Sequence, residues 1–352
     1  MATAEEHRRY GVLALYQFLP LDQLESLQQQ VRSFLEEQEA LGTILLATEG
    51  VNGTICYPII DENTTNETIL TFFRTLFPPL TRTRLSYSDQ PVFFRLKVRL
   101  KQEIVTLGVP SVDLREHRGQ YVQPQDWDRL TADPDTLVID TRNDYEVQIG
   151  TFAHAVDPQT TSFTEFPAWM ERQLASSSSH KPPKQIAMFC TGGIRCEKAT
   201  AWVQQQLSST NNANIPVYHL EGGILAYLAT IPPEQSSFRG ECYVFDQRTA
   251  VTHGLEPSHE YTLCKACRKP LSSIDRQHED HREGSACLYC VDDPEREERR
   301  QRYVDRHKQL AREKSKKQRR RREDGESPPQ QDELSHHDSN DQATEQAEST
   351  AS

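Results

Sequence analysis

Cys190 begins a run of six residues with the types needed for thiol chemistry, Cys190-Thr191-Gly192-Gly193-Ile194-Arg195. An apolar segment at 185–189 precedes the run and a helix-like segment at 197–207 follows it, which predicts a cysteine between a strand and a helix N-terminus. In such a turn the backbone N–H groups converge, and the helix dipole adds positive potential. Arg195 adds a cation, so we expect a lowered pKa for Cys190 and a nucleophilic thiolate where solvent reaches it. A buried cysteine at a strand end, with glycines that serve only the turn, is the alternative.

Four further cysteines have the spacing of a metal site. Cys264 and Cys267 form one CxxC pair, Cys287 and Cys290 form a second, and 19 residues separate the pairs. Each pair presents two thiolates and the two pairs complete a tetrahedron, so the spacing predicts a structural zinc ion. Residues 236–294, which hold these pairs, have little apolar content, and a metal would supply folding energy that their core cannot. Two redox-active or incidental pairs are the alternative.

A row of cations is the third candidate for function. Four apolar residues at 94, 96, 98 and 100 alternate with Arg95, Lys97, Arg99 and Lys101. Alternate side chains of a strand point to opposite faces, so the four cations are predicted to share one face. That face would contact the phosphates of a nucleic acid without reading its sequence, and Arg82 and Arg84 would extend it. A solvated outer face of a half-buried sheet is the alternative.

The charge of the chain is divided unevenly along its 352 residues, although the net value is -12. Residues 295–322 carry 14 Lys and Arg against 5 Asp and Glu, and residues 323–352 carry 9 acidic and no basic residues. We expect a basic helix at 295–322 and an acidic disordered tail at 323–352. A basic segment on an acidic body indicates a polyanion partner such as RNA, which the adjacent tail would weaken by folding back.

Hydropathy and cysteine usage indicate the compartment. The longest apolar run is too short to span a membrane, and the first ten residues lack the apolar core of a secretory signal. We therefore expect a cytoplasmic protein with no membrane partner. In a reducing compartment the eight cysteines are expected to serve thiol and metal chemistry instead of forming disulfides.

The elements that must carry these residues are predicted to form an α/β protein of several domains. Residues 1–108 have the order β-α-β-β-α-β of a ferredoxin-like domain, with the cationic strand as its last strand. Residues 109–132 are rich in turn residues and are interpreted as a linker. In residues 133–235 short apolar strands alternate with helices, which predicts a parallel sheet covered on both faces. Residues 236–294 follow as the small cysteine-pair module.

In a parallel sheet, chemistry lies beyond the carboxyl ends of the strands. Asp140, Cys190 and the Gly222-Gly223 turn all follow predicted strands, so we expect them at one edge of the sheet. Asp140 and Arg142 are therefore candidates for a supporting role beside Cys190.

These features together resemble a rhodanese domain, whose active loop begins with cysteine, has glycine fourth and often has arginine sixth. The chain matches this pattern at Cys190, Gly193 and Arg195. Related phosphatases need one more loop residue to encircle a phosphate, so the resemblance argues against phosphatase activity. A rhodanese resemblance alone implies a sulfurtransferase that carries a persulfide on Cys190.

Three longer runs, at 46–54, 189–198 and 240–246, resemble in combination the oxygen-dependent tRNA uridine(34) hydroxylase family over roughly residues 10–292. This resemblance implies hydroxylation of the wobble uridine to 5-hydroxyuridine, with tRNA as partner, no DNA, and molecular oxygen as co-substrate. The active-loop cysteine of the family falls on Cys190. The sequence has no recognisable flavin, haem or nucleotide motif. The thiolate, or a persulfide or oxygenated form of it, is expected to attack the carbon beside carbon 5 of uracil, with the loop N–H groups and Arg195 stabilising the anion.

The residues by themselves leave two alternatives to hydroxylase activity open. One is the persulfide-carrying sulfurtransferase, which would pass sulfur to tRNA or another acceptor. The other is a non-enzymatic RNA-binding module in which the cysteine loop is inert.

Overall fold

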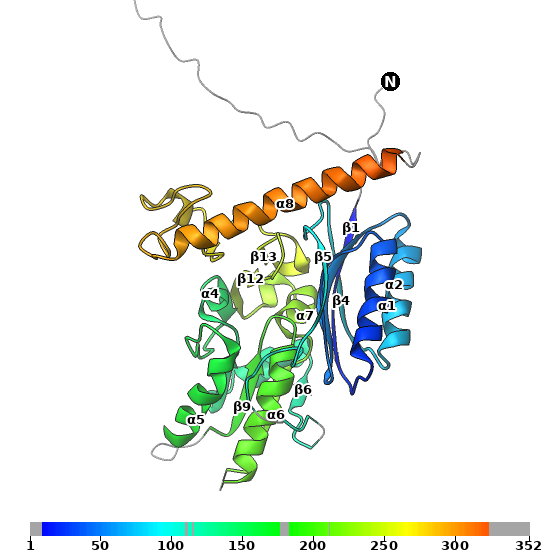
Figure 1. Ribbon diagram of the computed structural model, residues 1–352. Helices are drawn as coiled ribbons and strands as arrows, with labels where there is room; N and C mark the ends of the chain where they lie inside the picture. The colour runs from blue at the N-terminus through cyan, green and yellow to red at the C-terminus, as the bar shows by residue number, and fades with distance from the viewer. Residues whose placement is uncertain (1–8, 110–111, 115, 177–182, 211, 324–352) are drawn as a thin grey trace, which may run out of the picture. The chain divides into compact units, whose positions relative to one another are not determined.

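The computed structural model describes residues 9–109, 112–114, 116–176, 183–210 and 212–323 (Figure 1). The chain divides into two compact units after Arg300. Apart from Glu323, the predicted acidic tail at 323–352 lies outside the described residues. Every helix within the described ranges is too short or too polar to cross a lipid bilayer.

The N-terminal part is a five-stranded sheet of order β4-β1-β3-β2-β5. Helices α1 and α2 cover one of its faces (Figure 1). The order β1-α1-β2-β3-α2-β4 confirms the predicted ferredoxin-like arrangement. The elements are β1 (Tyr10–Phe18), α1 (Leu24–Glu37), β2 (Leu41–Ala47), β3 (Gly50–Pro58), α2 (Glu62–Leu76), β4 (Arg82–Ser88) and β5 (Leu96–Leu100).

The strand predicted to end this domain is a fifth, additional strand. β5 pairs parallel to β2 at one edge of the sheet, and β4 pairs with β1 at the other. All residues of β4 are half-buried, and only Leu85 and Tyr87 alternate with polar residues, which is too short a pattern to reveal the strand in sequence. The prediction that Arg82 and Arg84 extend the cationic row on β5 is wrong, because the two strands lie at opposite edges.

The next part is a four-stranded parallel sheet of order β6-β10-β9-β7, as predicted. Residues 109–132 are more than a linker, because β6 and α3 lie within them and β6 pairs with β10. Three residues of β6 are too few for a periodic signal. The elements are β6 (Gln120–Val122), α3 (Pro124–Thr131), β7 (Thr136–Asp140), α4 (Asp144–Val147), β8 (Gly150–Phe152), α5 (Phe166–Ser176), β9 (Gln185–Phe189), α6 (Ile194–Ser208), β10 (Val217–Leu220) and α7 (Gly223–Thr230).

Three two-stranded antiparallel sheets are formed by the chain after α7, one of them with β8. β11 (Phe238–Gly240) pairs with β8, β12 (Cys242–Tyr243) with β13 (Ala250–Val251), and β14 (Thr262–Leu263) with β15 (Pro270–Leu271). Residues 238–243 thus form two short strands with a break at residue 241. Helix α8 (Arg296–Glu323) coincides with the predicted basic helix at 295–322.

Candidate active site

Cys190 lies between the end of β9 and the start of α6, as the sequence predicts. Gly193 caps α6 with a φ of 95°, a left-handed conformation that favours glycine. Its backbone N–H donates to the Cys190 Sγ at 3.1 Å. The turn before α7 holds the loop from the other side, since the Ile224 N–H donates to the carbonyl oxygen of Cys190 at 2.9 Å. A Cβ on Gly223 would lie 2.5 Å from that oxygen, so the contact needs glycine.

The thiol of Cys190 ionises easily in this setting. Full burial disfavours the thiolate, but the Cys196 thiol, the Arg195 charge and the Gly193 N–H together lower the pKa of Cys190 to about 6. The direction is the one that the sequence predicts, and the thiolate predominates at neutral pH. Cys196 starts the helix yet points toward Cys190, and burial together with that thiolate raises its own pKa.

Arg195 is held by a buried carboxylate that the sequence did not single out. The Nη1 and Nη2 atoms of Arg195 donate to Glu146 at 2.7 and 2.8 Å, and Glu146 is fully buried. The Thr191 hydroxyl donates to the same carboxylate at 3.2 Å. Burial raises the pKa of Glu146, but the charge and hydrogen bonds of Arg195, the Arg142 charge and the Asn143 N–H together lower it by more, so the net shift is downward. Arg195 therefore anchors the loop to α4 and is already partnered, which limits its expected role as an anion stabiliser.

Asp140 and Arg142 form a second buried ion pair, with Nη2 of Arg142 2.7 Å from Asp140 Oδ2. Arg142 also donates to the Gly150 carbonyl oxygen at 2.5 Å, and the Thr151 hydroxyl donates to Asp140 at 2.9 Å. Both charged side chains are fully buried and neither lines the cavity that contains Cys190. The pair ties β7 to β8, which is structural support and not contact with a substrate.

A cavity of about 770 Å³ opens onto the cysteine loop. Cys190 is one of the lining residues although its side chain is fully buried, so the cavity leads a substrate toward the sulfur. The walls come from β1 to β4 of the N-terminal sheet, on the face opposite α1 and α2, and from the loop segments around Cys190, Glu221 and Phe245. Of the predicted loop residues, five line it: Cys190, Thr191, Gly192, Ile194 and Arg195.

Polar contacts fasten the N-terminal sheet over the cysteine loop. The Tyr16 hydroxyl of β1 donates to the buried carboxylate of Glu197 on α6 at 3.2 Å, and the Tyr121 hydroxyl of β6 donates to the same carboxylate at 2.8 Å. Arg82 of β4 forms an ion pair with Glu221, which directly follows β10. The sequence analysis missed Tyr16, Tyr121 and Glu197, because nothing in the linear order indicates that they meet.

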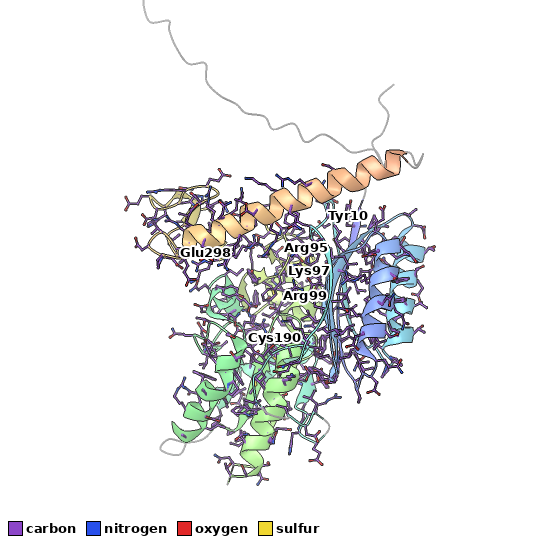
Figure 2. The ribbon with its side chains drawn as sticks, viewed as in Figure 1. Tyr10, Arg95, Lys97, Arg99, Cys190 and Glu298 are labelled. Carbon is purple, nitrogen blue, oxygen red and sulfur yellow. The ribbon has the colours of Figure 1, made fainter. Side chains whose placement is uncertain are left out.

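The cationic row on β5 and its flanks is separate from the cavity. Figure 2 shows Arg95, Lys97 and Arg99 following one another along this edge strand. Neither these three nor Lys101 is among the described residues that line the cavity. Arg99 and Lys101 are exposed, and Arg95 and Lys97 are partly buried. The row of cations lies outside the cavity, and its role as an RNA-binding surface stays a prediction.

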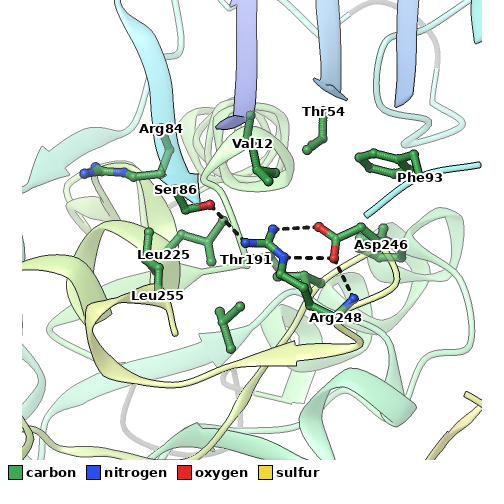
Figure 3. Close-up of a pocket in the computed structure, with 14 residues that line it drawn as sticks. Val12, Thr54, Arg84, Ser86, Phe93, Thr191, Leu225, Asp246, Arg248 and Leu255 are labelled. Atoms are coloured by element: carbon green, nitrogen blue, oxygen red, sulfur yellow. Dashed lines mark hydrogen bonds and ion pairs between the residues drawn. The ribbon is translucent and has the colours of Figure 1, made fainter. Parts of the chain in front are cut away.

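Arg248 connects Asp246 to the N-terminal sheet through an ion pair and a hydrogen bond. Arg248 donates to Asp246 at 2.6 Å and to the hydroxyl of Ser86 on β4 at 3.0 Å (Figure 3). A small cavity of about 80 Å³ lies here, lined partly by Val12, Phe93 and Leu255 (Figure 3).

The two CxxC pairs meet in one cluster that can hold a metal ion, with Cys267 half-buried and the other three cysteines buried. All four sulfur atoms lie within 4.8 Å of one another, with Cys267 and Cys287 3.6 Å apart and Cys287 and Cys290 3.7 Å apart. A tetrahedron of metal–sulfur bonds of about 2.3 Å needs sulfur atoms about 3.8 Å apart. The thiols of Cys264 and Cys290, 4.0 Å apart, also agree with this geometry.

Known proteins share this architecture. A family described as UPF0176 acylphosphatase like domain matches residues 10–104, and the Rhodanese-like domain family matches residues 123–230. Three relatives named tRNA uridine(34) hydroxylase align along most of their length. The protein of Sinorhizobium medicae is 46% identical, and the alignment covers 86% of this chain and 91% of that protein. The protein of Agrobacterium fabrum is also 46% identical, and the alignment covers 87% of this chain and 92% of that protein. The Acaryochloris marina protein is 43% identical, and the alignment covers 85% of this chain and 91% of that protein. At this identity and coverage, the chain belongs to the tRNA uridine(34) hydroxylase family.

Proposed function

We propose that this protein hydroxylates carbon 5 of uridine 34 in tRNA, with molecular oxygen as oxidant and Cys190 as nucleophile. The observation that carries the proposal is a cysteine of lowered pKa that lines a cavity of about 770 Å³ in a member of this family. Pockets of about 300–1,000 Å³ hold ligands of nucleotide size. A wobble base is unpaired in free tRNA, so turning it into the cavity costs less than flipping a paired base.

The thiolate of Cys190 adds to carbon 6 of uracil in this mechanism, and the electrons of the C5–C6 double bond form an enolate. Carbon 5 then gains one atom of molecular oxygen, and loss of the C5 proton with release of the thiolate restores the ring. The second oxygen atom leaves as water, which takes two electrons and two protons that a thiol-class reductant supplies as it becomes a disulfide. The Gly193 N–H and the Arg195 charge stabilise the thiolate as nucleophile and as leaving group.

Oxygen labelling tests this reaction. Purified protein is incubated with tRNA and a thiol reductant under ¹⁸O₂, and the nucleosides are analysed by mass spectrometry. The 5-hydroxyuridine is expected to be two mass units heavier than the product formed under ordinary oxygen. The same mixture without oxygen is the control and is expected to leave uridine 34 unchanged. A thiolated nucleoside, or a persulfide on Cys190 with thiosulfate:cyanide activity and unmodified uridine 34, would decide for sulfur transfer.

We also propose that the cysteine cluster holds a structural zinc ion. Four thiolates are the donor set of such sites, and they would fix the two turns of a module with few apolar residues. Elemental analysis of the purified protein is expected to find about one zinc per chain, and Cys287→Ser is expected to lose it and to lower the melting temperature. The matched control is Cys56→Ala, a buried cysteine of the N-terminal sheet, which keeps the metal. Equal zinc content in both variants would contradict the site.

A further inference from the structure

Arg84 of β4 is an unneutralised cation in the wall of the cysteine cavity. Its side chain lines the cavity, and its buried Nε has no hydrogen-bond partner among the described residues. Figure 3 shows its guanidinium pointing away from the neighbouring ion pair of Asp246 and Arg248. Arg84 is half-buried, and taking a guanidinium group partly out of water without an anion costs free energy, so its position in the cavity wall points to an anionic ligand.

The other charged side chains that line this cavity are already paired. Arg82 forms an ion pair with Glu221, and Arg195 forms one with Glu146. Arg84 is thus the arginine without an ion-pair partner among the lining residues that the structure describes. Burial lowers the pKa of Arg84, and no neighbouring anion counters it.

The guanidinium lies close to the loop that carries the chemistry. A Cβ built on Gly222 would lie 3.3 Å from the Nη2 atom of Arg84, and one on Gly193 would lie 3.5 Å from the Gly222 nitrogen. The missing side chain of Gly222 therefore leaves space for the guanidinium group of Arg84, which lies next to the turn that contacts the Cys190 loop. Phe245 lines the same cavity and is 61% exposed, which offers a base an aromatic face.

We propose that Arg84 binds a backbone phosphodiester group of the RNA whose base enters the cavity. Arg forms paired hydrogen bonds with phosphate oxygens, and a phosphate contact fixes the position of a nucleotide without reading its base. This inference rests on the proposed function, because it takes tRNA as the ligand. It differs from a role for Arg84 in stabilising the uracil enolate, which would act on the chemical step.

Binding and turnover separate these roles. Arg84→Gln is expected to weaken tRNA binding about tenfold and to lower the slope of log affinity against log salt by about 0.7–0.9, the value of one phosphate contact. Turnover at saturating tRNA is expected to stay within about twofold. Arg84→Lys, which keeps the charge, is expected to recover most of the affinity and the salt slope. The matched control is Arg74→Gln on α2, whose side chain is half exposed outside the cavity, and it is expected to change neither quantity.

Two results would overturn the inference while leaving the proposed function intact. One is unchanged affinity and salt slope in a folded Arg84→Gln protein that hydroxylates tRNA. The other is a loss confined to turnover, which would assign Arg84 to the enolate. If the wild-type protein itself neither bound nor hydroxylated tRNA, the proposed function and this inference would fail together.

Discussion

Cys190→Ser is expected to lower the rate of 5-hydroxyuridine formation at least about 10³-fold. Serine keeps the size of the side chain and the Gly193 N–H contact, but its hydroxyl group stays protonated where the thiol, with a pKa of about 6, is ionised. The measurement is nucleoside mass spectrometry of tRNA incubated with the purified variant under oxygen. Affinity for tRNA is expected to stay within about twofold, because Cys190 is proposed to act on the base while Arg84 holds the phosphate of the bound RNA.

The pH profile of the wild-type protein is the companion measurement. Because the thiolate is the reactive form, activity is expected to fall about tenfold per pH unit below pH 6 and to level off above it. Cys56→Ala serves as the matched control, since Cys56 lies in the N-terminal sheet and does not line the cavity. Full hydroxylation by Cys190→Ser would rule out Cys190 as the nucleophile.

Glu146→Gln is expected to lower the free energy of unfolding by about 3 kcal/mol and to impair hydroxylation. The amide keeps the shape of the side chain but removes the charge that pairs with Arg195, and an unpaired buried guanidinium group costs about 3–5 kcal/mol. The loop would then lose the anchor that holds Thr191 and Arg195 to α4. Urea unfolding followed by tryptophan fluorescence measures the change in stability.

A double variant separates charge from shape. Glu146→Gln combined with Arg195→Met removes both charges and is expected to recover part of the lost stability, because no unpaired ion stays buried. Glu62→Gln is the matched control, since its ion pair with Arg9 is about half exposed and is worth roughly 0.5 kcal/mol. Equal stability of Glu146→Gln and Glu62→Gln would show that Glu146 does not hold the loop.

Short-range patterns were sufficient for the strand, turn and helix around Cys190, the parallel sheet and the pairing of the CxxC turns. In each case the residues that define the feature are neighbours in sequence or repeat with a local period. The strands β4 and β6 were harder to predict from the sequence. β4 was not predicted because only Leu85 and Tyr87 alternate with polar residues in it, and β6 was not predicted because three residues carry no period.

The sequence by itself determined that Cys190 stands at a helix N-terminus with Gly193 and Arg195, because loop geometry and the charge of its own side chains are local properties. Tertiary structure alone decided what these groups face. It paired Arg195 with Glu146, 49 residues away in the chain, and turned Asp140 and Arg142 into buried support. It also separated Arg84 from the cationic edge strand and brought it to the cysteine cavity. The reason is physical: a buried charge takes its partner from whatever the packed elements bring within a few ångströms, and no local pattern encodes that proximity.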